Sequence, residues 1–238
     1  MGGSCLYQSY GLFGGPTPDI DDPNLFKALF EAVQELLTKK HILALHDISD
    51  GGLLVALFEM ALCSNQGIDL DLNLSDKEKI IPKLFSEESG LVIEVEKNNF
   101  PSIKNKLNEK GIFFDEIAQK NNEQQLRIKN FNEVLFEEGI YKLYDYWDDV
   151  SFKIQAQRDN PETASSERKA FKKFDRFLTP KINFDIPAIT QKLFSSKPKI
   201  ALLREQGING HYDMAAALMA AGFEVNDVHL SEVGTKIK

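Results

Sequence analysis

The sequence contains little cysteine and no long apolar run. Its 238 residues include only two cysteines, Cys5 and Cys63, which stand far apart and outside any Cys-x-x-Cys spacing. This usage argues against a disulfide framework and a zinc knuckle, and it favours a reducing compartment such as the cytoplasm. No apolar stretch approaches the ~18 residues that a membrane helix needs, so we expect no membrane-spanning segment.

Basic residues are also in deficit, with 28 Lys and Arg against 36 Asp and Glu and a formal net charge of −8. Affinity for nucleic acid comes largely from phosphate neutralisation by Lys and Arg, so we do not expect nucleic acid as the main partner. The opening "MGGSCL" carries Leu6 where an N-myristoylation signal requires Ser or Thr, and it lacks the segments of a signal peptide. With 42% hydrophobic residues, the chain is typical of a globular protein with a core.

The stretch "HDISDGG", residues 46–52, gathers two carboxylates, a hydroxyl and two glycines between apolar runs. "HILAL" before it predicts a buried strand, and "LLVALFEMALC" after it predicts a helix, so the stretch is a strand-to-helix turn. Two interpretations stay open. Either Ser49 or Asp50 caps the helix, or the turn binds a metal ion and a phosphate through hard oxygens and close backbone approach. We expect His46 to be a packed or hydrogen-bonded strand-end residue.

The surrounding pattern predicts a mixed α/β domain over residues 1–137. Asp22-Pro23 predicts the start of an amphipathic helix, and a second helix is expected over Pro101–Lys110. Alternating or apolar segments predict strands at 68–74, 90–96, 112–117 and 126–128. The apolar face of the first helix is predicted to contain Leu25, Phe26, Leu29, Phe30, Val33, Leu36 and Leu37.

Residues 138–197 read as a helical and irregular linker. Tyr141, Tyr144, Trp147, Val150 and Ile154 recur at helical spacing, and we interpret them as core rather than as a base-stacking surface. The polar stretch that follows is expected to be irregular. Its basic residues interleave with Phe171, Phe174, Phe177 and Leu178, which favours a solvated face over an apolar seam rather than a phosphate-binding patch.

Residues 198–238 predict a strand, a loop, a helix and a second strand, which is how a doubly wound parallel sheet begins. A parallel sheet of two strands cannot cover its own faces, so we expect this unit to be a truncated start and the chain to be a fragment.

Four stretches together resemble one family, the long single-chain phosphoribosylformylglycinamidine synthases of purine biosynthesis. "HDISDGGLLVALFEMA" resembles the signature turn of the second synthase repeat, which belongs to the aminoimidazole-ribonucleotide-synthetase superfamily, and "GGSCLYQSYG" resembles the start of the C-terminal subdomain of that repeat. "RDNPETA" is similar to the family's stretch after the aromatic helix. "PKIALLREQGINGHYDMAAALMAAGFEVNDVHLSEV" is similar to the start of its class I glutamine amidotransferase domain.

The resemblance implies an α/β fold: a mixed-sheet C-terminal synthase subdomain, a helical linker and the start of an amidotransferase. It implies an enzyme that uses ATP and Mg²⁺ to phosphorylate the formamide oxygen of formylglycinamide ribonucleotide, after which ammonia from glutamine displaces the phosphate. The rest of the same polypeptide is the implied partner. The turn is implied to hold an auxiliary ATP or ADP, with Asp47 as metal ligand, Ser49 as nucleotide ligand and Asp50 left as the cap.

The loop with Glu205, Gln206 and Asn209 either borders the glutamine pocket or is a plain turn. Glu87 and Glu88 match an acidic pair in the family to which no role is assigned. Ile48 departs from the family, whose long forms commonly carry Arg there, and the tail "GTKIK" does not read like the family's continuation.

An amidotransferase nucleophile is expected beyond Lys238, and the working ATP site is expected in the absent first repeat, so the fragment itself is predicted to be inactive. The alternatives are a non-catalytic folding or interaction module, and another ATP-dependent member of the superfamily.

Overall fold

The computed structural model describes residues 1–173, 181, 183 and 196–233, and the chain divides into two compact units, 1–175 and 176–238. Phe174, Phe177, Leu178 and the tail 234–238 lie outside the described residues, so the structure does not test the predictions made for them. The division at residues 137 and 197 stays a prediction. Within the described ranges, every helix is too short or too polar to cross a membrane.

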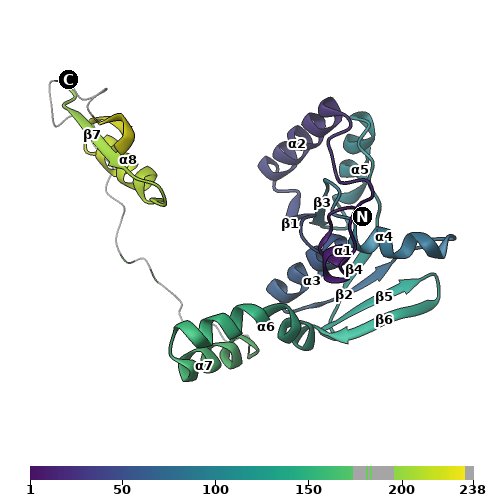
Figure 1. Ribbon diagram of the computed structural model, residues 1–238. Coiled ribbons are helices and arrows are strands. Elements are labelled where there is room, and N and C mark those ends of the chain that lie inside the picture. Colours follow the sequence, from purple (N-terminus) through teal and green to yellow (C-terminus); the bar gives the residue numbers. More distant parts are fainter. Residues whose placement is uncertain (174–180, 182, 184–195, 234–238) are drawn as a thin grey trace. The chain divides into compact units, whose positions relative to one another are not determined.

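The first unit contains seven α-helices in its described part (Figure 1). They are α1 (Cys5–Ser9), α2 (Pro23–Thr38), α3 (Gly52–Ser64), α4 (Ile80–Phe85), α5 (Phe100–Glu109), α6 (Ile140–Arg158) and α7 (Pro161–Phe171). A short 3₁₀ turn, Lys77–Lys79, precedes α4.

The strands of the first unit form two sheets, which confirms the mixed α/β class. They are β1 (Ile42–Asp47), β2 (Gly67–Asp71), β3 (Leu91–Val95), β4 (Ala118–Asn121), β5 (Gln125–Asn130) and β6 (Glu133–Gly139). β1 pairs antiparallel with β3, and the larger sheet has the order β4-β2-β5-β6 with β2 and β5 parallel. The edge strands β4 and β6 run antiparallel to their neighbours β2 and β5.

Charge in the larger sheet is paired across three strands. Arg127 on β5 lies opposite Asp69 on β2 and opposite Glu137 on β6. Its guanidinium contacts Asp69 at 3.0 Å and Glu137 at 2.7 Å, and it also reaches Glu123 at 2.5 Å. Cross-strand neighbours of opposite charge favour one register over its slipped alternatives.

The main core lies between α3, the strands β2 and β5, and the start of α6. Leu70, Leu126 and Ile140 come from three different elements and are at most 1% exposed. Helix α3 is apolar on most of its surface and supplies the largest share of this core. Its buried members are Gly52, Leu53, Ala56, Leu57, Phe58, Ala61 and Leu62.

A second, smaller core joins α2 to α5, which lie side by side in Figure 1. Asp22 starts α2 as predicted, because its carboxylate accepts hydrogen bonds from the backbone of Asn24 and Leu25. The predicted apolar face of α2 is only partly buried. Leu36 is 1% exposed, whereas Phe26 and Phe30 are 46% and 60% exposed.

The structure corrects several expectations about local structure. Residues 112–117 form no strand, and the strand follows at β4. β6 was not anticipated. In the aromatic stripe, Tyr144 is 6% exposed and is core as predicted, but Trp147, Val150 and Ile154 are each more than half exposed, so the interpretation was wrong for them.

The stretch expected to be irregular after Asn160 contains helix α7. Asn160 caps it by accepting hydrogen bonds from the backbone of Glu162 and Thr163, and Pro161 occupies the first helical position. An Asn-Pro-Glu sequence is a helix-start signal, but the polar composition of the surrounding stretch favoured an irregular segment.

The second unit has the predicted strand-loop-helix-strand order. It contains β7 (Lys199–Arg204), α8 (His211–Ala220), β8 (Glu224–His229) and a 3₁₀ turn, Leu230–Glu232. β7 and β8 are parallel, as a doubly wound sheet requires.

We predict that Asp22→Ala lowers the free energy of unfolding of the first unit by about 1 kcal/mol, because two backbone N–H groups at the start of α2 lose their acceptor. Urea unfolding followed by the fluorescence of Trp147, the only tryptophan, reports on this unit. Asp21→Ala is the matched control, since Asp21 is an exposed neighbour outside the cap. Equal destabilisation by the two variants would contradict the capping role.

Candidate functional site

The turn between β1 and α3 depends on the backbone freedom of two glycines. Gly51 has φ = 85° and Gly52 has φ = 71°, a left-handed region that residues with a side chain rarely adopt. Gly51 is the residue that caps α3, and no side chain makes a cap hydrogen bond there. The capping interpretation of Ser49 and Asp50 is therefore wrong. Ser49 contributes only its backbone carbonyl, which accepts the N–H of Gly52 at 2.9 Å.

The segment from Leu84 to Gly90 encloses the inner side of this turn. A Cβ atom on Gly52 would lie 2.8 Å from the carbonyl oxygen of Leu84 and 2.8 Å from the Cα of Phe85, so the backbones of α3 and α4 touch. On the other side, the Ile48 N–H donates to the Gly90 carbonyl at 2.9 Å. The remaining open side of the turn carries the exposed side chains of Asp47 and Ser49, whereas the exposed carboxylate of Asp50 lies near Cys5 and Glu87.

Glu87 lies under the turn and satisfies two backbone donors at once. Its Oε1 atom accepts hydrogen bonds from the N–H of Gly51 and from the N–H of Cys5, each at 2.8 Å. Burial raises the pKa of Glu87, but these hydrogen bonds outweigh it and hold the pKa below its ordinary value. Sequence reasoning left this residue without a role, whereas Glu88 beside it is exposed.

A signal for Glu87 existed in the strand pattern. β1 and β3 pair antiparallel with Asp47 opposite Leu91. Residues just before Leu91 must therefore lie beside residues just after Asp47, which is where Glu87 meets Gly51. The sequence pattern predicts the strands but not their pairing, so it does not predict this contact.

His46 is a hydrogen-bonded residue at the end of β1, as predicted. Its Nε2 atom lies 2.7 Å from a carboxylate oxygen of Glu59 on α3. The other oxygen of Glu59 accepts the indole N–H of Trp147 on α6 at 2.9 Å. This carboxylate of α3 thus links the end of β1 to α6.

Cys5, Asp50 and Glu87 each bring a potential metal-ligating atom within 4.8 Å of the others. The group is poorly prepared to bind a metal, because thiolate is the ligating form of cysteine and the pKa of Cys5 is raised by burial and by the Glu87 carboxylate. One oxygen of Glu87 is also occupied by two backbone donors. Cys5 and Glu87 therefore support the turn through their hydrogen bond, and Asp50 is an exposed carboxylate beside them.

The residue types on the open side fit Mg²⁺ and a nucleotide phosphate. The carboxylate of Asp47 is 71% exposed, and its nearest ionic neighbour is His46 Nδ1 at 3.6 Å. A hard, accessible carboxylate oxygen and a hydroxyl match the ligands that Mg²⁺ takes while retaining several waters. The N–H groups of Gly51 and Gly52 are already engaged within the protein. These two N–H groups therefore do not remain free to bind an anion.

The second unit brings Glu205, Gln206 and Asn209 onto one exposed loop between β7 and α8. Glu205 lies 3.8 Å from Nε2 of His229, the last residue of β8. Because β7 and β8 are parallel, this loop stands at the carboxyl ends of both strands, where doubly wound sheets bind ligands. The loop thus occupies the expected edge, and its role stays a prediction.

A groove of about 1030 Å³ in the first unit was not anticipated. It runs from Asp22, which caps α2, and Phe26 on α2 to Ile48 and Gly90 beside the turn, and its lining is mostly apolar. It explains why the apolar face of α2 is only partly buried: part of that face borders the groove instead of packing against another element.

Two family models match the chain. Residues 1–129 match the family described as AIR synthase related protein, C-terminal domain. Residues 197–237 match the CobB/CobQ-like glutamine amidotransferase domain. The first match contains the turn at residues 46–52, and the described part of the second match contains β7, α8 and β8.

The chain is 37% identical over 236 residues to the "Probable phosphoribosylformylglycinamidine synthase, chloroplastic/mitochondrial" of Arabidopsis thaliana. The match covers 98% of this chain but only 17% of that relative.

Among solved structures, Thermotoga maritima PurL complexed with ATP has a TM-score of 0.47 at 23% identity. The match covers 53% of this chain and 24% of the PurL chain. PurL complexed with FGAR has a TM-score of 0.45 at 23% identity, covering 49% and 20%. With more than half of its length matched by one family model, the chain belongs to the family of AIR synthase related proteins, of which residues 1–129 form the C-terminal domain.

Proposed function

We propose that this chain is part of a phosphoribosylformylglycinamidine synthase, the ATP- and glutamine-dependent ligase that converts formylglycinamide ribonucleotide to formylglycinamidine ribonucleotide in purine biosynthesis. The observation that carries the proposal is the order of the two matched domains in one chain, an AIR-synthase C-terminal domain followed by a glutamine amidotransferase domain. The similarity to a relative with this name along 98% of the chain supports the same assignment.

Within that enzyme, the turn at residues 46–52 would hold an auxiliary ATP or ADP. Bound Mg²⁺ would neutralise the charge of the nucleotide phosphates. The chain's own contribution is to present the Asp47 carboxylate and the Ser49 hydroxyl on the open side of a turn whose backbone is fixed from below. Since the nearest N–H groups are engaged, these two side chains would carry the recognition.

The loop with Glu205, Gln206 and Asn209 would border the pocket that binds glutamine. Its support is its position at the carboxyl ends of two parallel strands, together with the amidotransferase match. The nucleophile that releases ammonia would come from another part of the polypeptide, because Cys5 and Cys63 both lie in the first unit.

Two alternative functions explain the observations less well, and the location of the protein is a separate proposal. Another ATP-dependent member of the superfamily would not explain the amidotransferase match. A non-catalytic folding or interaction module would not explain why a synthase-type domain precedes an amidotransferase domain in one chain. We propose a cytoplasmic location from the free cysteines, although the named relative is described as chloroplastic/mitochondrial.

We predict that Asp47→Asn weakens retention of ADP or ATP with Mg²⁺ at least about tenfold in the longest polypeptide that carries this chain. A tenfold loss of affinity removes about 1.4 kcal/mol of ligand-dependent stability. Isothermal titration and melting curves with and without Mg-nucleotide measure both effects. Glutamine hydrolysis should remain, since Asp47 belongs to the other matched domain.

Asp50→Asn is the matched control for Asp47→Asn, because both are exposed carboxylates of the same turn. We expect the Asp50 variant to keep its nucleotide. If Asp47→Asn retained nucleotide and melting temperature unchanged, or if both variants lost nucleotide equally, the turn would not be a metal and nucleotide site of the kind proposed.

We also predict that the purified 238-residue chain releases no ammonia from glutamine above the buffer rate. The loop of the second unit carries carboxylate and amide groups but no thiol, and both cysteines belong to the first unit. An enzyme-coupled ammonia assay measures this, with a complete glutamine amidotransferase as the positive control. Glutamine-dependent ammonia that disappears in the double variant Cys5→Ser/Cys63→Ser would contradict the prediction.

A further inference from the structure

Glu87 occupies a position that external anions often take in proteins. It lies where the N–H of Gly51 emerges at the start of α3, a helix of 13 residues. The positive end of a helix favours a negative charge at this place. A carboxylate supplied by the chain itself fills it, so a bound phosphate would have to lie on the other side of the turn, toward Asp47 and Ser49.

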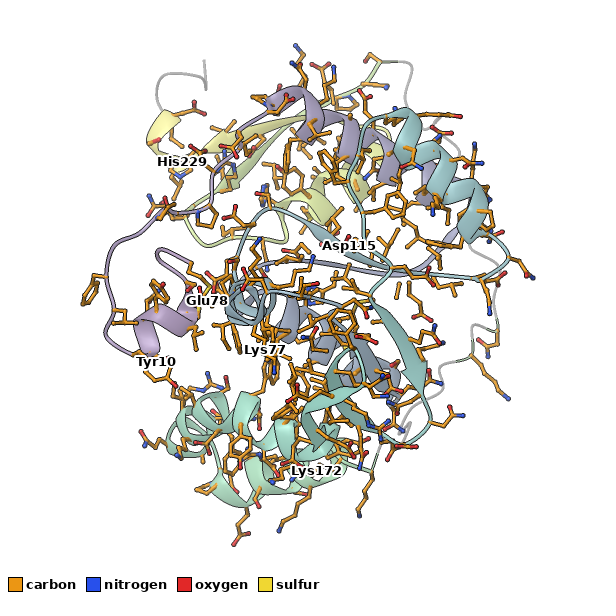
Figure 2. The ribbon with its side chains drawn as sticks, turned by 90° about the vertical axis from the view of Figure 1, so that its right-hand side faces the viewer. Tyr10, Lys77, Glu78, Asp115, Lys172 and His229 are labelled. Carbon is orange, nitrogen blue, oxygen red and sulfur yellow. The ribbon has the colours of Figure 1, made fainter. Side chains whose placement is uncertain are left out.

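The same carboxylate oxygen connects two segments that are distant in sequence. Its partners are separated from Glu87 by 36 residues at Gly51 and by 82 residues at Cys5. Cys5 begins α1, whose preceding Ser4 is 2% exposed and donates to the carbonyl of Met1 at 2.8 Å. Glu87 therefore holds the anchored N-terminal segment against the turn, while Tyr10 beyond α1 is 74% exposed (Figure 2).

The other contacts of the segment do not replace this interaction. The backbone contact of Gly52 with Phe85 fixes the start of α3, and the bond from Ile48 to Gly90 fixes the end of β1. Between these two points, the N–H of Gly51 has Glu87 as its acceptor. Hydrogen bonds from backbone N–H groups to an ionised carboxylate are stronger than neutral ones.

We propose that Glu87 is the positioning residue of the turn: its carboxylate fixes the backbone at Gly51 and Cys5, so that Asp47 and Ser49 are presented in one geometry to the ligand. The effect on ligand binding rests on the proposed nucleotide function, whereas the effect on the backbone does not. Glu87 is not itself a ligand of the nucleotide or of its metal ion.

The first experiment measures the backbone and needs no nucleotide. The amide protons of Gly51 and Cys5 are followed by NMR during a pH titration of the folded 238-residue chain. Both should shift together with one midpoint below the ordinary glutamate value of 4.5, because the carboxylate that they share loses its charge there. The stabilisation of the turn is present above that range and is lost as the pH falls through the lowered pKa of Glu87.

In Glu87→Gln, this shared titration should vanish from both amides, while their hydrogen exchange should be faster than in the wild type but slower than in Glu87→Ala, because the neutral amide oxygen still accepts. In Glu87→Ala, exchange at both amides should accelerate about tenfold or more. Glu88→Ala is the matched control and should change neither property. The proposal is overturned if the two amides titrate independently of Glu87, or if Glu87→Ala leaves their exchange unchanged.

The second experiment measures Mg-ADP affinity in the longest polypeptide that carries the chain. Glu87→Ala should weaken binding about tenfold, and the affinity of Glu87→Gln should lie between that of Glu87→Ala and that of the wild type. Tighter binding by Glu87→Ala would show that the carboxylate only repels the phosphates and would overturn the positioning role. If the wild type bound no nucleotide, the proposed function would fail, and the amide measurements would still decide whether Glu87 fixes the turn.

Discussion

The close approach of two backbones, at Gly52 of α3 and at Phe85, the last residue of α4, is the constraint on which the first unit depends. A Cβ atom at Gly52 would lie 2.8 Å from backbone atoms. Backbone atoms, unlike side chains, cannot change rotamer to relieve such a contact. The approach allows α3 to start immediately after the turn and to bury its apolar surface against β2 and β5. It also brings the loop with Glu87 under Gly51. The core and the candidate site therefore share one geometric requirement.

The elements with strong local signals could be predicted from the sequence. Asp22-Pro23 started α2 and the alternation from Ile68 to Leu74 gave β2, because capping and side-chain period act over a few residues. The strand-turn-helix at residues 46–52 was recognised for the same reason. The parallel start of the second unit also followed from its pattern.

What could not be predicted depends on pairing between distant segments. β6 carries charged and apolar residues without clear alternation, and its partner β5 determines that it is a strand. Ser49 and Asp50 are typical capping residues, yet the left-handed backbone of Gly51 takes the cap position and leaves both side chains exposed. Glu87 resembled any surface acid, since its two donors lie 36 and 82 residues away.

The position of β6 at the end of the larger sheet has a consequence for self-association. Its outer residues include Val134 and Leu135, which are 51% and 37% exposed, so the strand offers an apolar edge that another chain can extend. Glu133, Glu137 and Glu138 lie along the same strand. An antiparallel copy of β6 would place these carboxylates near one another, while Arg127, the guanidinium that offsets Glu137 within the sheet, is already shared among three acids. Lys77 and Lys142 pair with Glu133 and Glu138 at this edge, so charged side chains of both signs flank the apolar residues, an arrangement that disfavours edge-to-edge aggregation.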